Sequence, residues 1–243
     1  MPKYGLSGTM LKWIAAIFMV IDHVGVILFP ETRILRVLGR LAFPVFAFMI
    51  AEGCRYTKNK WRYFGTVLGV GAGCQLVLFL YNGSMEMNIL LTFSISVLLI
   101  FAFAWIKEQI FAENAPISYP FVGILLFGCM IVCTGVAGEH LDLDYGATGC
   151  MVPLFAALLH PPKGRGNTLL HRIDCPITHV LCMGAGLLLL ALESGGTQWF
   201  ALCALPLLML YSGRRGRWRM KYFFYVFYPA HLLVIQGIAW LIS

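Results

Sequence analysis

Residues 11–29 read LKWIAAIFMVIDHVGVILF, an apolar stretch in which an aspartate and a histidine, Asp22 and His23, stand side by side. About 20 apolar residues cross a bilayer as a helix, so this stretch predicts a membrane span. An ionisable side chain near the middle of such a helix costs roughly 2.5–3.5 kcal/mol on insertion scales, and such residues usually serve a function. No small-residue cleavage site follows, so the stretch is interpreted as a retained span and not as a signal peptide.

The composition of the whole chain agrees with a membrane protein. Of its 243 residues, 60% are hydrophobic and 12% are charged, whereas a soluble domain is about 25% charged. The mean hydropathy is +0.80. The eight cysteines form no Cys-x-x-Cys pair, so they are predicted to be packing residues, and neither a disulfide framework nor a metal site is expected.

The apolar runs predict an all-α, polytopic integral membrane bundle of about nine transmembrane helices, forming a single domain over residues 1–243. The predicted helices are 11–29, 34–53, 64–81, 88–106, 118–137, 147–160, 176–192, 197–211 and 222–242. Nine spans place every clearly basic loop on one side and every acidic loop on the other, except at residues 30–40. By the positive-inside rule, the N-terminus lies inside and the C-terminus outside.

The net charge of +7 therefore describes a cytoplasmic rim and not a nucleic-acid surface. The expected location is the bacterial cytoplasmic (inner) membrane, with the lipid bilayer as a partner. The exceptional loop, 30–40, should lie outside yet carries Arg33, Arg36 and Arg40. Arg36 and Arg40 are four residues apart, so on a helix they share a face and are the nearest candidates to pair with Asp22.

Lys12 and His23 are eleven residues apart, which is close to three full helical turns. Both side chains therefore point the same way, about 16 Å apart along the axis, and join an inner cation to a deeper imidazole. His23 is either a satisfied interhelical hydrogen-bonding group or a functional one. Asp22 points about 100° away, so it is not predicted to pair with His23.

The last span opens with KYFFYVFYPAHLL, residues 221–233, in which Tyr225, Tyr228 and His231 recur every three residues. Tyrosines near the membrane surface are typical of an aromatic belt. A belt does not explain His231, which lies about mid-membrane. His231 could carry protons, bind substrate or orient another group, and the sequence does not distinguish these three roles. Tyr228 is a candidate substrate contact.

Further polar groups lie at the ends of other spans. On the outer side, Asn88 and Thr92 are candidates for substrate binding, as are Asp144 and Tyr145, with an N-cap as the alternative for Asp144. On the inner side, Glu52 is expected to form a surface ion pair with Arg55. The segment YSGRRGRWRMKY, 211–222, is either a topogenic loop or a site for a polyanion, because arginine binds phosphate through its planar fork. Its candidate phosphate-binding residues are Arg214, Arg215 and Arg217.

Six blocks along the chain carry a resemblance to a known family: LKWIAAIFMVIDHVG (11–25), LRVLGRLAFPVFAFMIAEG (35–53), NILLT (88–92), DYGATG (144–149), ALPLLMLYSGRRG (204–216) and KYFFYVFYPAHLL (221–233). They resemble the TraX family of membrane proteins, which is associated with N-terminal acetylation of conjugative pilin. The family looks related to transmembrane acyltransferases of the acyltransferase-3 type, in which an arginine and a histidine, eleven positions apart in the first helix, mark the active site. Lys12 and His23 reproduce this spacing, with lysine in place of arginine.

The resemblance implies an acyl-CoA-dependent acyltransferase that uses acetyl-CoA or another acyl-CoA and acylates an extracytoplasmic amine or hydroxyl, such as a pilin N-terminus or a glycan. His23 is the expected general base or acylated nucleophile, with Asp22 and His231 as further catalytic candidates. Arg36, Arg40 and Asn88 would bind the acceptor or polarise the thioester, and Lys12 would bind CoA phosphates with the arginines of 211–222. Two alternatives are open: a proton-coupled transporter or flippase, and a non-catalytic scaffold for pilus or envelope assembly.

Overall fold

The computed structural model describes residues 5–83, 86–112, 116, 118–162, 169–216 and 221–242. These residues form helices, and the described part of the chain contains isolated β-bridges but no strand. The helices are α1 (Gly8–Ile27), α2 (Arg33–Gly39), α3 (Ala42–Tyr56), α4 (Lys60–Asn82), α5 (Ile89–Ile110), α6 (Ser118–His140), α7 (Gly146–Ala157), α8 (Leu169–Arg172), α9 (Pro176–Ser194), the 3-10 helix η1 (Gly196–Cys203), α10 (Ala204–Met209) and α11 (Lys221–Ile242). The prediction of an all-α membrane protein is confirmed.

Six helical segments among the described residues are long and apolar enough to cross a membrane. They are Gly8–Ile27, Arg33–Tyr56, Lys60–Leu80, Ile89–Ile110, Ser118–His140 and Pro176–Ser194. The other three predicted spans fall on shorter apolar helices, at Gly146–Ala157, Gly196–Met209 and Val226–Ile242. The count of nine spans and the orientation in the membrane therefore stay predictions.

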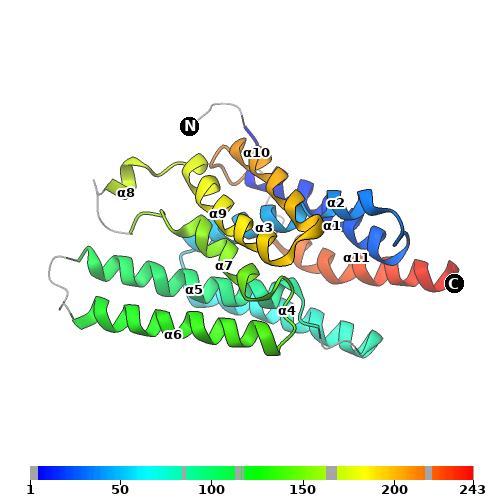
Figure 1. Ribbon diagram of the computed structural model, residues 1–243, viewed down its shortest axis with the longest axis horizontal. Coiled ribbons are helices and arrows are strands. Elements are labelled where there is room, and N and C mark those ends of the chain that lie inside the picture. Colours follow the sequence, from blue (N-terminus) through cyan, green and yellow to red (C-terminus); the bar gives the residue numbers. More distant parts are fainter. Residues whose placement is uncertain are drawn as a thin grey trace. The chain divides into compact units, whose positions relative to one another are not determined.

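The chain divides into two compact units, whose boundaries fall inside α3 and α9. The first unit comprises residues 1–49 and 187–243, and the second comprises residues 50–186. In the first unit, α1 packs against α2 and α11, and η1 packs against α2 and α10. In the second unit, α5 packs against α4, α6 and α7 (Figure 1). This division by contacts does not test the prediction of one domain.

The start of α1 and the interruption between α2 and α3 place the polar residues of the first unit. Ser7 caps α1, because its side chain accepts a hydrogen bond from the Met10 N–H. The second predicted span is broken at Arg40 and Leu41 into α2 and α3. As a result, Arg36 lies within the short helix α2 and Arg40 lies at its end.

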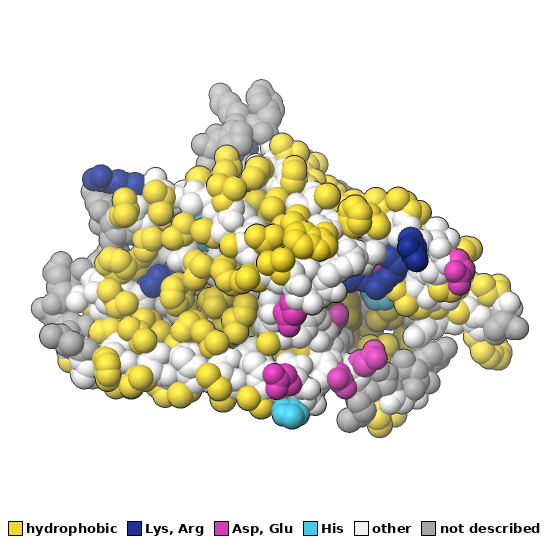
Figure 2. All heavy atoms as spheres, viewed as in Figure 1, with side chains coloured by type: hydrophobic (Ala, Val, Ile, Leu, Met, Phe, Trp, Pro, Cys, Tyr) yellow, Lys and Arg dark blue, Asp and Glu magenta, His cyan; other side chains and the backbone are white. Residues whose placement is uncertain are grey.

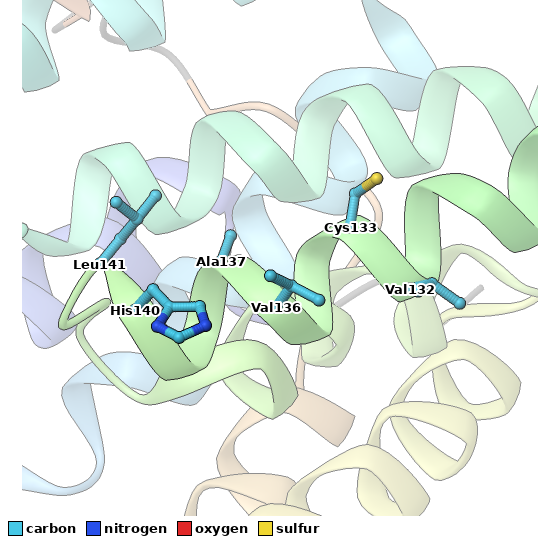
Figure 3. Close-up of a pocket in the computed structure, with 6 residues that line it drawn as sticks. All are labelled: Val132, Cys133, Val136, Ala137, His140 and Leu141. Atoms are coloured by element: carbon cyan, nitrogen blue, oxygen red, sulfur yellow. The ribbon is translucent and has the colours of Figure 1, made fainter.

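Apolar side chains point outward over much of the surface. On α6, Phe121, Leu126 and Val132 are each more than half exposed, and hydrophobic side chains cover most of the face in Figure 2. A hollow on this helix is lined by Val132, Cys133, Val136, Ala137, His140 and Leu141 (Figure 3). Since α6 and the residue after it supply the entire lining, this hollow is part of the outer surface of that helix and not an enclosed site.

Candidate functional site

Two histidines that are distant in the sequence meet in the first unit. His23 lies on α1 and His231 on α11, and Nε2 of His231 is 3.3 Å from Nδ1 of His23. The ring centroids are 5.0 Å apart and the planes cross at 71°. A second contact joins the same two helices, because the ring centroid of Trp13 on α1 lies 4.8 Å from that of Phe223 on α11.

The backbone fixes which nitrogen of each ring carries a proton. Nδ1 of His23 lies 2.8 Å from the Met19 carbonyl oxygen, and Nδ1 of His231 lies 2.9 Å from that of Phe227. A carbonyl oxygen only accepts, so each Nδ1 carries the hydrogen. Nε2 of a neutral His231 is then an acceptor that faces the Nδ1–H of His23.

The remaining ring nitrogen, Nε2 of His23, is therefore unprotonated and carries a lone pair. Within the described ranges, no protein group forms a hydrogen bond with it. An imidazole whose Nδ1–H is held and whose Nε2 is open has the arrangement of a general base or a nucleophile. The histidine pair of the first unit thus has one nitrogen available for chemistry.

Asp22 pairs with the two arginines that the sequence predicted. Its Oδ1 lies 2.9 Å from Nη1 of Arg36 and 3.7 Å from Nη2 of Arg40. The carboxylate is 17% exposed and Arg40 is 12% exposed, whereas Arg36 is 34% exposed. Arg40 also donates to Oε1 of Gln198 in η1, at 3.2 Å. Gln198 was missed by the sequence analysis, and its contact with Arg40 adds η1 to this cluster.

Gly39 is the residue that lets Asp22 approach α2. A Cβ at position 39 would lie 2.2 Å from Oδ1 and 2.3 Å from Cβ of Asp22. Only glycine leaves room for the carboxylate at this distance.

We expect Gly39→Ala to lower the free energy of unfolding by about 1–3 kcal/mol, because the added methyl forces Asp22 out of its pairing geometry. Equilibrium unfolding in mixed detergent micelles measures the change. The matched control is Gly73→Ala in α4, where a Cβ meets nothing within 4 Å and should be neutral or stabilising. Equal stability of the two variants would contradict the steric argument.

The N-terminal end of α1 contacts the loop that follows α10. The N–H groups of Gly8 and Thr9 donate to the carbonyl oxygens of Arg214 and Arg215, at 2.8 and 3.1 Å. Lys12 lies one turn further along α1, so three predicted phosphate-binding residues come from two distant segments to one end of this helix. Arg217 lies outside the described residues. The predicted spacing of Lys12 and His23 falls within uninterrupted α1, so their common face is retained.

Aromatic rings surround His231. Phe227 stacks on it with centroids 5.2 Å apart and planes 10° apart. Tyr228, 9% exposed, contacts it edge-on with centroids 5.8 Å apart. Tyr228 therefore lies beside the histidine pair, as a predicted substrate contact should, although substrate binding itself stays a prediction.

Comparison with known proteins agrees with the resemblance in the sequence. Residues 7–239 match the family described as TraX protein. The chain belongs to the TraX family. A probable fimbrial assembly protein of Dichelobacter nodosus, FimC of serogroup H1, is 27% identical over 94% of both chains. An uncharacterised protein of Rickettsia prowazekii is 43% identical over a quarter of each chain. No solved structure matches.

Four predicted substrate-binding residues of this TraX chain lie in the second unit and have structural contacts there. Asn88 caps α5 by accepting from the Leu90 N–H, and its amide donates to Gly71 and Gln75. The Thr92 hydroxyl donates to the Asp144 carbonyl at 3.0 Å. These hydrogen bonds account for Asn88 and Thr92 without a substrate.

The predicted N-cap at Asp144 is wrong by one residue. Tyr145 occupies the N-cap of α7 with φ of +62°, and its side chain forms no capping hydrogen bond. Asp144 itself is exposed. The substrate-binding roles proposed for Asp144 and Tyr145 stay predictions.

The expected surface ion pair of Glu52 is also wrong. In this TraX chain Glu52 is buried, 6% exposed, because α3 continues past it to Tyr56. Its Oε1 lies 3.6 Å from Nε2 of His160, and Arg55 instead pairs with Asp174. His160, His179 and Asp174 were missed by the sequence analysis, although a histidine inside the apolar run 176–192 was a detectable signal.

Proposed function

We propose that this TraX-family chain is a membrane acyltransferase that moves an acyl group from cytoplasmic acyl-CoA to an extracytoplasmic amine or hydroxyl. The observation that carries the proposal is the open Nε2 of His23, whose ring is held by Met19 and His231. The relative named as a fimbrial assembly protein supports a pilin or fimbrial subunit as the acceptor. Acetyl is the acyl group that we propose.

The residues at the N-terminal end of α1 fit the phosphates of an acyl-CoA. The backbones of Arg214 and Arg215 lie beside the first turn of α1 and Lys12 lies one turn further on, so three cationic residues come from this region. Guanidinium groups bind phosphate through two parallel hydrogen bonds. The N–H groups of Gly8 and Thr9 are already bonded to the loop. Phosphate binding would therefore come from the side chains and not from the helix terminus. When bound, the acyl-CoA supplies an activated thioester.

In the proposed step, Nε2 of His23 takes a proton from the amine or hydroxyl group of the acceptor substrate. At the same time, the nitrogen or oxygen of that group forms a bond to the acyl carbon of the thioester. The carbon–sulfur bond breaks, and the imidazolium returns its proton to the departing CoA thiolate. The positive charge on His23 is stabilised through Nδ1–H by the Met19 carbonyl and the lone pair of His231. General base catalysis of this kind contributes about 10²–10⁴-fold to a rate.

The Asp22 cluster positions His23 in this proposal. Asp22 is adjacent to His23 on α1, and its ion pairs tie this turn of the helix to α2. Arg36 keeps a third of its side chain exposed, so its remaining N–H groups are available to the acceptor or to the negative charge on the carbonyl oxygen.

The test uses purified protein in proteoliposomes with labelled acetyl-CoA on one side and a pilin-like peptide with a free N-terminus on the other. Label covalently attached to the peptide, with one CoA released for each group transferred, supports the proposal. Movement of a substrate across the membrane without acetyl-CoA would indicate a transporter instead. Neither transfer nor CoA release would contradict the proposal.

His231 is proposed as a positioning residue, so its replacement should lower kcat and leave KM for acetyl-CoA unchanged. Loss of a hydrogen bond to a charged group, worth 1.5–3 kcal/mol, corresponds to roughly a 10- to 100-fold fall in kcat. His231→Leu should show this fall. His231→Asn, whose amide oxygen can accept from His23, should recover part of it. Equal kcat values for both variants would contradict the positioning role.

A further inference from the structure

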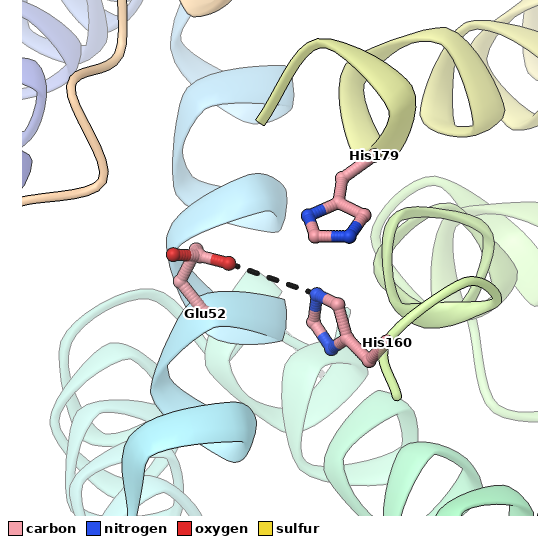
Figure 4. A group of neighbouring side chains, drawn as sticks. All are labelled: Glu52, His160 and His179. Carbon is pink, nitrogen blue, oxygen red and sulfur yellow. Dashed lines mark ion pairs between the residues drawn. The ribbon is translucent and has the colours of Figure 1, made fainter. Parts of the chain in front are cut away.

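Three buried side chains from separate segments of the second unit point at one another (Figure 4). Glu52 comes from α3, His160 follows α7, and His179 lies on α9. One carboxylate oxygen and one nitrogen from each imidazole all lie within 4.8 Å of one another. The two rings are 4.5 Å apart between centroids.

Each imidazole of this cluster has a buried nitrogen that forms no hydrogen bond among the described residues. Nε2 of His160 and Nε2 of His179 are buried, and neither forms a hydrogen bond within the described part of the chain. His179 is 1% exposed and the His160 side chain is 10% exposed. The nearest acidic oxygens are Oε1 of Glu52, 3.6 Å from His160 Nε2, and Oδ1 of Asp174, 3.2 Å from His179 Nε2. A buried polar atom without a hydrogen bond is destabilising, and an ion shared by both nitrogens and Glu52 would satisfy them.

Neighbouring charged residues hold the cluster in place. Arg55, one turn after Glu52, pairs with Asp174, and Oδ1 of Asp174 lies 3.2 Å from Nε2 of His179. Lys107 donates to the backbone carbonyl of His160 at 2.7 Å and to that of Leu158 at 3.1 Å. Asp174 therefore places a second carboxylate beside His179, and Lys107 fixes the backbone of His160.

We propose that Glu52, His160 and His179 bind one divalent transition metal ion of the zinc class. Two histidines and one glutamate are a ligand set that zinc uses in catalytic sites, with a fourth position open. Bonds of about 2.1 Å in a tetrahedron separate ligand atoms by about 3.4 Å. The Glu52–His160 distance of 3.6 Å is close to this value, and the cluster, whose ligand atoms lie within 4.8 Å of one another, would contract around the ion.

The charges around the cluster indicate the fourth ligand. The formal charges of Glu52 and Asp174 balance those of Arg55 and Lys107, so the ion adds two positive charges to a buried region. An anionic fourth ligand such as hydroxide reduces this charge. This inference uses none of the residues assigned to acyl transfer and does not rest on that function.

The test measures metal binding by the full chain after removal of any affinity tag. We expect about one zinc per chain in purified protein, and after its removal by chelation we expect one equivalent of Co²⁺ to bind and give the visible absorption of tetrahedral Co²⁺. Glu52→Gln and His179→Gln should lose this stoichiometry. Asp174→Asn should retain one equivalent with roughly 10- to 100-fold weaker affinity. The matched control, His140→Gln on the exposed end of α6, should bind like the unchanged protein.

Binding by the unchanged protein decides the proposal even where a variant fails to fold. Stripped, folded protein that takes up no Co²⁺ or Zn²⁺ at micromolar concentration would overturn it. Uptake that is equal in His140→Gln, Glu52→Gln and His179→Gln would also overturn it, because the metal would then bind elsewhere.

Discussion

Replacement of His23 by alanine is expected to lower the rate of acyl transfer by about 10²–10⁴-fold, the contribution of a general base. The physical reason is that Nε2 of His23 is the open nitrogen of the histidine pair. His231 cannot substitute for it, because its Nε2 already faces His23. The measurement is the initial rate of CoA release by purified protein, followed with a thiol reagent at saturating acceptor.

Two comparisons separate this loss from a loss of folding. His140→Ala removes an exposed imidazole on α6 and should leave the rate unchanged. The thermal midpoint of His23→Ala should lie near that of the original protein, because the pair contributes only modest hydrogen bonds. A folded His23→Ala protein with undiminished turnover would rule out the proposed mechanism.

The second large effect is expected on stability. Asp22→Asn keeps the shape of the side chain but removes the charge that faces Arg36 and Arg40. Removing one partner of a buried ion pair costs 3–5 kcal/mol because it leaves an uncompensated charge. Arg36 is a third exposed, so water screens part of this cost. We expect a loss on the order of 2–3 kcal/mol in equilibrium unfolding with a denaturing detergent.

The matched control for Asp22→Asn is Glu193→Gln, a carboxylate that is exposed at the end of α9 and belongs to the same unit. It should change stability by less than about 0.5 kcal/mol. The double variant Asp22→Asn with Arg36→Gln should recover part of the loss, since it removes one unpaired charge. A cost for Asp22→Asn no larger than that for Glu193→Gln would show that the cluster is not stabilising.

The sequence predicted what depends on local patterns. Long apolar runs defined α1, α4, α5, α6 and α9, because membrane spans need about 20 apolar residues. The pairing of Asp22 with Arg36 and Arg40 was predicted because basic residues stood in a loop where orientation did not favour them. Six blocks in order were sufficient to predict the TraX family.

Contacts between distant segments could not be predicted in the same way. No local pattern indicates that His231 lies against His23, since their contact depends on how α1 and α11 pack. The cluster of Glu52, His160 and His179 likewise draws one residue from each of three segments. An interrupted or short second span was predicted, but the position of the break at Arg40 and Leu41 was not, because apolar residues continue on both sides of it.

The measurement that tests the central claim most directly is nuclear magnetic resonance of the protein with nitrogen-15 in its histidines, assigned by single replacement of His23 and His231. We predict that both imidazoles are neutral at pH 7, with the proton on Nδ1, and that a hydrogen-bond coupling joins Nδ1 of His23 to Nε2 of His231. A proton on Nε2 of His23, or no coupling between the two rings, would contradict the claim that this nitrogen is open for catalysis.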